Sequence, residues 1–141
     1  MTRLSLGLIA LSVFLSCAPT ALIRLGNSTV TVELDATGGD QNPTWTLTGN
    51  EVDELSRFLE NPPPAEGVTF LPAADSDYRG FRITAANRAF EEPPRAYLVR
   101  DGYIQVLVAA GEAGRIFRDV RGAEDWLIEN ARGRGYGTMI P

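Results

Sequence analysis

The sequence contains no histidine and no lysine, and its only cysteine is Cys17. Without histidine the chain lacks the side chain that most often acts as a general base near neutral pH, so serine–histidine and cysteine–histidine pairs cannot form. Without lysine it can form neither a side-chain Schiff base nor the phosphate-binding site of a P-loop. A single cysteine excludes an internal disulfide. We therefore expect a protein that is not an enzyme, needs no cofactor and is stabilised by packing.

All 13 basic residues are arginine, against 18 acidic residues, and the net charge is −5. This charge is unevenly distributed along the chain. Residues 18–78 hold two arginines and ten acids, a balance of −8, whereas residues 79–141 hold ten arginines and eight acids, a balance of +2. Nucleic-acid binding needs a basic face, so we expect no nucleic acid among the partners.

The N-terminus carries the longest apolar run of the chain. Arg3 supplies one positive charge, and residues 4–15 follow without any charged side chain. A helix that crosses a bilayer needs about 20 apolar residues, so these twelve residues are too few. A short basic start followed by an apolar stretch of this length is typical of a signal peptide. Pro19 interrupts the run at once, which disfavours a buried N-terminal helix.

The end of this run resembles the lipobox of bacterial lipoproteins, in the residues Phe14-Leu15-Ser16-Cys17. In that family a diacylglycerol is attached to the cysteine sulfur, and cleavage leaves the cysteine as the first residue. The resemblance implies lipidation at Cys17, attachment to a membrane, and a location in the cell envelope facing the periplasm or the exterior. The alternative is a secreted protein cleaved after Ala18, because Ser16 and Ala18 fit the small-x-small pattern of ordinary signal peptidase sites.

The chain divides into four predicted segments. Residues 1–17 form the signal peptide, 18–27 a tether, 28–135 a single α+β domain and 136–141 a C-terminal tail. Removal of the signal peptide leaves 124 residues, the size of one domain. A chain of this length buries roughly 65% of its unfolded surface, enough for a core without disulfides.

Residues 28–35 alternate between apolar and polar side chains, which predicts a half-buried strand. Glycine, asparagine and proline in residues 36–43 predict a turn-rich loop. A helix is expected to begin after Thr48, because Thr48 and Glu51 have the spacing of a capping box. The prolines in residues 61–64 end that helix, since proline offers no backbone N–H and restricts the residue before it.

The second half of the chain contains the clearest local pattern, a β-hairpin. Residues 96–100 and 103–108 flank Asp101-Gly102, a dipeptide suited to a type I′ turn. A two-residue turn predicts the pairing of the strands, with Arg100 opposite Tyr103, Val99 opposite Ile104 and Tyr97 opposite Val106.

Three further elements complete the prediction. Residues 81–85 alternate as a strand does, residues 115–118 are compatible with a short edge strand, and residues 123–131 carry the apolar stripe of an amphipathic helix that stops near Gly133. We predict an α+β fold, with an antiparallel sheet of four or five strands and two helices on one of its faces.

Acidic residues in loops suggest two further kinds of site. Asp75, Asp77 and Gly80 have the spacing of the start of a calcium loop, but Arg79 stands where an oxygen ligand is needed, so no metal site is predicted. Asp35, Asp40, Asp75 and Asp77 could also converge as paired carboxylates of a hydrolase.

Two short segments suggest a binding surface, through Asn42, Trp45, Tyr78 and Arg79. Tyr78 and Arg79 could bind a carboxylate or a sugar. Trp45 could be a stacking surface, although we expect it to be mainly a core residue.

The sequence thus predicts an exported, lipid-anchored, small binding domain of the bacterial cell envelope. Its partners would be the membrane, through the N-terminal lipid, and an envelope protein or glycan. The alternatives are a structural or assembly subunit of an envelope complex and a carboxylate-based hydrolase.

Overall fold

The computed structural model describes residues 23, 25–26, 28–36, 41–74, 76–86, 95–108 and 114–141. The predicted signal peptide and Cys17 lie outside these residues. Within them, no helix combines the length and the apolar character needed to cross a bilayer.

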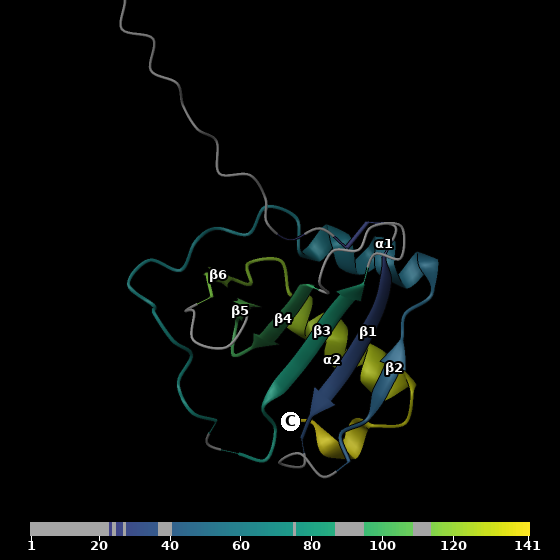
Figure 1. Cartoon of the computed structure of the whole chain (residues 1–141). Helices are drawn as coiled ribbons and strands as arrows, with labels where there is room; N and C mark the ends of the chain where they lie inside the picture. The colour runs from purple at the N-terminus through teal and green to yellow at the C-terminus, as the bar shows by residue number, and fades with distance from the viewer. Residues whose placement is uncertain are drawn as a thin grey trace, which may run out of the picture.

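Six antiparallel strands form one sheet in the order β2-β1-β3-β4-β5-β6 (Figure 1). The α+β class and the antiparallel sheet are confirmed, whereas the predicted number of four or five strands is wrong. The strands are β1 (Thr29–Asp35), β2 (Thr44–Thr46), β3 (Gly80–Ala86), β4 (Arg95–Arg100), β5 (Tyr103–Leu107) and β6 (Ile116–Arg118).

The strand that the prediction lacks is β2, which has only three residues. Leu34 N donates to Pro43 O at one end of this pairing, and Leu47 N donates to Val30 O at the other, both at 2.9 Å. Three residues are too few to show the alternation that identifies a strand from sequence. The strand exists because β1 supplies it with a partner.

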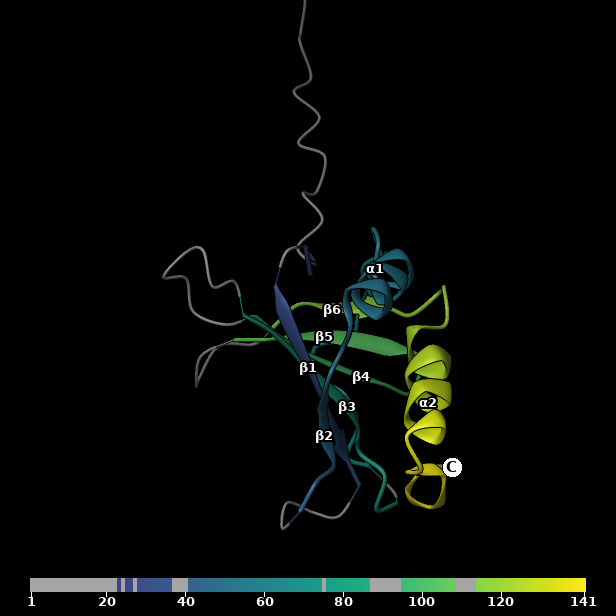
Figure 2. The ribbon, with the colours of Figure 1, turned by 90° about the vertical axis from the view of Figure 1, so that its right-hand side faces the viewer.

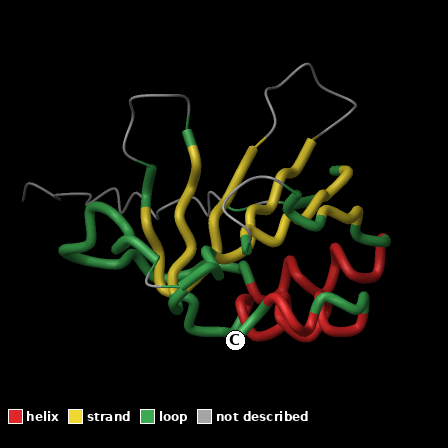
Figure 3. Tube along the Cα trace, turned by 90° about the horizontal axis from the view of Figure 1, so that it is seen from below, coloured by secondary structure: helices red, strands yellow, loops and turns green. Residues whose placement is uncertain are grey.

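Two helices, α1 (Gly49–Phe58) and α2 (Ala123–Gly133), cover one face of the sheet (Figures 2 and 3). A 3₁₀ helix, η1 (Gly137–Met139), follows α2. The capping box predicted at the start of α1 is present, because the Thr48 side chain accepts from Glu51 N and the Glu51 carboxylate accepts from Thr48 N. These bonds satisfy backbone donors that have no partner within the helix.

Alternate residues of the strands point toward the helices and form one hydrophobic core. In β1 these are Val30, Val32 and Leu34, which are completely buried. Leu55 of α1 and Leu127 of α2 meet them from the helix layer and are also completely buried. Burying one such side chain contributes about 1.5–3 kcal/mol, so this layer is the main source of stability.

The hairpin of β4 and β5 has the predicted register. Its two turn residues both adopt positive φ angles, 53° at Asp101 and 72° at Gly102. This is the backbone of a type I′ turn, whose twist matches that of the strands beside it.

Residues on both flanks of these elements also pack into the core. Ile23 and Leu25 are 6% and 2% exposed and belong to the core cluster. At the other end, Tyr136, Met139 and Ile140 are half-buried against it. The described residues on both flanks, before β1 and after α2, are therefore held against the core.

The sheet face opposite the helices, which we call the open face, carries the residues that alternate with the core positions. Thr46, Thr31 and Thr84 lie side by side across β2, β1 and β3. Arg82 of β3 is exposed on this face, opposite Glu33 of β1. No described helix covers the open face (Figure 2).

The β6 edge of the sheet is closed by the connection between α1 and β3. Arg118 N donates to Pro63 O at 2.9 Å, and Ala65 N donates to Ile116 O at 3.0 Å. Because Pro63 and Pro64 have no N–H of their own, this segment cannot continue the ladder to another strand. The prolines therefore protect this edge from pairing with other chains.

Candidate functional site

Three connections meet at one end of the sheet, where β1 ends, β3 begins and β4 turns into β5. We call this region the turn end and define it as residues 41–43, 76–79 and 101–102. Arg79 N donates to Asp35 O at 2.6 Å, which fixes the start of β3 against the end of β1. Three of the four residues predicted to bind a ligand lie within the turn end.

Tyr78 joins the turn end to α2. Its hydroxyl donates to Glu124 Oε1 at 2.7 Å, and the other oxygen of the same carboxylate accepts from Gly102 N at 3.0 Å. The Tyr78 ring also meets Phe81 edge to face, with 5.9 Å between centroids. One carboxylate thus holds together the segment before β3, the hairpin turn and the first turn of α2.

This environment raises the pKa of Tyr78 far above its usual value of 10.0. Burial is the largest cause, and the hydrogen bond to Glu124 and its negative charge follow. The tyrosine therefore stays protonated and donates to Glu124 at any physiological pH. Its hydroxyl is bonded within the fold and is not available to a ligand.

Replacing Tyr78 by phenylalanine is expected to lower the free energy of unfolding by about 1.5–3 kcal/mol at neutral pH, since the lost bond joins a charged group. Because the folded pKa is raised, this contribution is complete below pH about 10 and declines as the unfolded tyrosine ionises above it. Urea titrations of both proteins between pH 7 and 11 measure the difference. A gap between the two proteins that stays constant across this range would contradict the assignment.

Arg100 anchors the long connection before β3 to the sheet. Its side chain is 9% exposed, and its Nη2 donates to Pro72 O. Arg100 Nε lies 3.4 Å from Asp101 Oδ2, an ion pair, yet it makes no directed hydrogen bond with a described atom. The buried cation is thus balanced by the charge of Asp101 and oriented by the carbonyl of Pro72.

Asn42 closes the connection between β1 and β2. Its Oδ1 accepts from Ala36 N at 3.2 Å, and its Nδ2 donates to Glu33 Oε1 at 2.9 Å. A second carboxylate oxygen, Asp35 Oδ1, lies 3.5 Å from the same Nδ2. These bonds make Asn42 a structural residue of the turn end.

Arg79 differs from the other three predicted residues. Its backbone N–H is fixed to Asp35 while its side chain is exposed. The guanidinium makes no hydrogen bond or ion pair with any residue that the structure describes. Among the four predicted binding residues, Arg79 is therefore the one whose side-chain polar group is not bonded to the described part of the fold.

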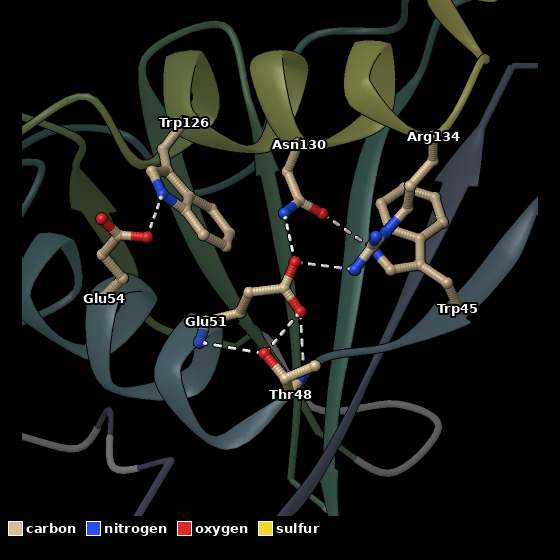
Figure 4. Close-up of polar contacts among 7 residues, drawn as sticks. All are labelled: Trp45, Thr48, Glu51, Glu54, Trp126, Asn130 and Arg134. Atoms are coloured by element: carbon tan, nitrogen blue, oxygen red, sulfur yellow. Dashed lines mark hydrogen bonds and ion pairs between the residues drawn. The ribbon is translucent and has the colours of Figure 1, made fainter.

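Trp45 lies apart from the turn end, in the middle of β2 and on the helix side (Figure 4). It is half-buried and stacks on Tyr136 at 5.6 Å, and it meets Phe81 edge to face at 6.4 Å. Its Nε1 donates to Asn130 Oδ1 at 3.0 Å. The Arg134 guanidinium lies 5.7 Å from the centre of the ring. These contacts make Trp45 a packing residue between β2 and the C-terminal region.

A polar cluster between the two helices lies next to this tryptophan (Figure 4). Glu51 Oε1 accepts from Asn130 Nδ2 at 2.9 Å and from Arg134 Nη2 at 2.8 Å, and Glu51 Oε2 accepts from Thr48 N at 2.8 Å. Burial raises the pKa of Glu51, but the bonds from Thr48 and Asn130 and the charge of Arg134 outweigh it and leave the pKa below its usual value. Both oxygens of the Glu51 carboxylate already accept hydrogen bonds, so we assign it a structural role.

The sequence predicts Glu51 as part of the helix cap alone, and its bonds to Asn130 and Arg134 are not predicted. Asn130 and Arg134 are four residues apart, so they lie on the same face of α2. This spacing is the one feature of the sequence that indicates the contact. Two polar residues beside the apolar stripe of α2 mark the edge at which a second helix can pack.

The acids predicted as paired carboxylates are only partly described. Asp40 and Asp75 lie outside the described residues, Asp35 is half-buried beside Asn42, and Asp77 is exposed. Within the described ranges, no group of three or more acids, histidines or cysteines is placed to hold a metal ion.

The fold and the turn end together define a two-layer α+β domain with a braced set of connections at one end of its sheet. No protein-family model, curated protein or solved structure matches the chain.

Proposed function

We propose that this chain is an exported binding domain, held on a membrane of the bacterial cell envelope by lipid on Cys17, and that it binds an envelope protein or glycan through the turn end. The lipobox-like residues 14–17 support the anchor. Cys17 is the only cysteine, and the core of the fold is built without a thiol.

The observation that carries the binding role is the Glu124 carboxylate, which accepts from both Tyr78 and Gly102. This shared acceptor fixes two connections relative to each other before any ligand arrives. Binding residues commonly stand on connections that a rigid scaffold positions. A surface that is already ordered loses less conformational entropy on binding.

The chemistry of the turn end favours a partner with an acidic group. The exposed Arg79 guanidinium is a planar donor that can bind a carboxylate or a phosphate through two parallel hydrogen bonds. Asp77 and Asp101 are also exposed in the turn end, and the Asp101 side chain is 62% exposed. These acidic side chains repel further negative charge, so the turn end favours a partner with a single acidic group over a large polyanion. The net charge of −5 acts in the same direction.

Substituting Arg79 by alanine is expected to reduce capture of the partner at least tenfold while leaving stability unchanged, since the guanidinium makes no hydrogen bond or ion pair with the described residues. The matched control is Arg82→Ala, which removes an arginine that is also exposed, from the open face. Tagged full-length proteins are cross-linked in intact envelopes, and the captured proteins and glycan fragments are quantified by mass spectrometry.

Loss of the same captured molecules with Arg82→Ala, and not with Arg79→Ala, would move the binding surface to the open face. Equal capture by all three proteins would contradict binding through either arginine.

A further inference from the structure

We infer that the turn end faces away from the membrane, because the linker between Cys17 and the folded domain is too short to let the domain turn over. The bilayer then lies against the opposite end of the sheet, which we call the tether end and define by Thr29, Ala86, Arg95 and Val108. This inference rests on the proposed lipid anchor and adds to it an orientation.

The first step is the point at which the chain becomes fixed. Ile23 and Leu25 are buried in the core cluster, and Ser28 N donates to Leu25 O at 3.1 Å. Pulling Ile23 away from the domain would expose an apolar side chain that is 6% exposed in the fold. The linker is therefore limited to residues 18–22.

The second step is the reach of this linker. Going from Cys17 to Ile23 takes six residue steps, and a fully extended chain covers about 20 Å in that number of steps. The lipid holds Cys17 at the bilayer surface, so Ile23 stays within about 20 Å of that surface.

The third step is the place where the linker joins the fold. Residues 23 and 25–26 lie beside the start of β1 and near α1 in both views (Figures 1 and 2). β1 has seven residues and spans about 20 Å from its start to its end. The turn end lies at the far end of that span, because Arg79 N donates to Asp35 O and Asn42 Oδ1 accepts from Ala36 N. A linker of about 20 Å cannot run past the whole sheet and its connections to place the turn end on the bilayer.

The tether end has side chains that suit a lipid surface. Thr29 lies opposite Ala86, and Arg95 pairs with Ala85 one position further along. Val108 is 43% exposed there, and Arg95 is exposed as well. An arginine near a bilayer is attracted by anionic head groups, and an exposed valine loses little by contact with lipid.

Fluorescence quenching in membranes tests this orientation. Two variants of the full-length chain, Val108→Cys at the tether end and Ser76→Cys at the turn end, each place a fluorophore on an exposed position. Acylation blocks the Cys17 sulfur, so the introduced cysteine is the only free thiol. The lipidated proteins are reconstituted in vesicles of phosphatidylethanolamine and phosphatidylglycerol that contain nitroxide-labelled lipid. We expect quenching at Val108 to exceed quenching at Ser76 at least threefold.

Two controls separate the orientation from the anchor. An insertion of about ten glycine and serine residues between Ala21 and Leu22 lengthens the linker and is expected to make quenching at the two positions similar. Metabolic labelling with a palmitate analogue reports lipid on Cys17 independently. Equal quenching, or stronger quenching at Ser76, in a protein that carries palmitate overturns the orientation and leaves the anchor intact. Absence of palmitate overturns the anchor and the orientation with it.

Discussion

Replacement of Gly80 by alanine is expected to lower the free energy of unfolding by about 3 kcal/mol, through backbone strain and steric overlap combined. Gly80 begins β3 with a φ angle of +103°, a conformation that residues with a Cβ atom rarely adopt. An added Cβ would lie 2.5 Å from Arg100 Cβ and 2.6 Å from Val99 O.

Neither of these neighbours of Gly80 can move without breaking other contacts. Val99 is paired with Phe81 in the ladder between β3 and β4 and is completely buried. Arg100 is held by Pro72 O and by the charge of Asp101. The alanine variant therefore has to separate β3 from β4 or release the long connection, and both changes would disturb the turn end.

Gly135→Ala is the matched control for this effect. Gly135 has a φ angle of +90°, but an added Cβ would meet nothing within 4 Å. It should cost about 1 kcal/mol from strain alone. Urea unfolding of the two variants and the wild type measures both values. Equal losses of unfolding free energy in Gly80→Ala and Gly135→Ala would show that the Cβ added at Gly80 does not clash with Arg100.

The second large effect is expected for Trp45→Ala, which should cost about 3 kcal/mol, the lower end of the range for core tryptophans because this ring is half-buried. The substitution removes the stacking on Tyr136, the edge-to-face contact with Phe81 and the donor to Asn130. Trp45→Phe keeps a ring but not the N–H, so it should cost only about 1 kcal/mol for the lost hydrogen bond, with a further small loss of packing.

The contrast between these two variants identifies the role of the ring. Urea unfolding gives the stability of each, and cross-linking in envelopes gives their capture of the partner. A packing role predicts a large loss of stability for alanine and normal capture by phenylalanine. A Trp45→Ala variant with wild-type stability and no capture would make Trp45 a ligand-binding residue instead.

Local patterns in the sequence predicted the elements whose structure is set by neighbouring residues. The Asp101-Gly102 turn determines which residues of β4 and β5 face each other, because two residues with positive φ allow one hairpin geometry. The capping box at Thr48 and Glu51 likewise needs only residues within one turn of helix. Both features are found in the structure.

The contacts that define the turn end, and those that hold Trp45, could not be predicted in this way. The bond from Tyr78 to Glu124 joins residues 46 positions apart, and the bond from Trp45 to Asn130 joins residues 85 positions apart. No periodicity encodes such pairs, since they depend on how the helices pack on the sheet. The four residues predicted for binding therefore separate into three that use their polar groups inside the fold and one, Arg79, that presents its side chain to solvent.

The intact mass of the mature protein, purified from membranes in detergent, tests the lipid anchor most directly. We expect a chain that begins at Cys17 and carries the mass of a diacylglycerol, with or without a further acyl chain on its amine. We also expect Cys17→Ser to abolish this species. An unmodified chain that begins at Pro19, recovered in the soluble fraction, would contradict the anchor and the membrane-proximal arrangement built on it.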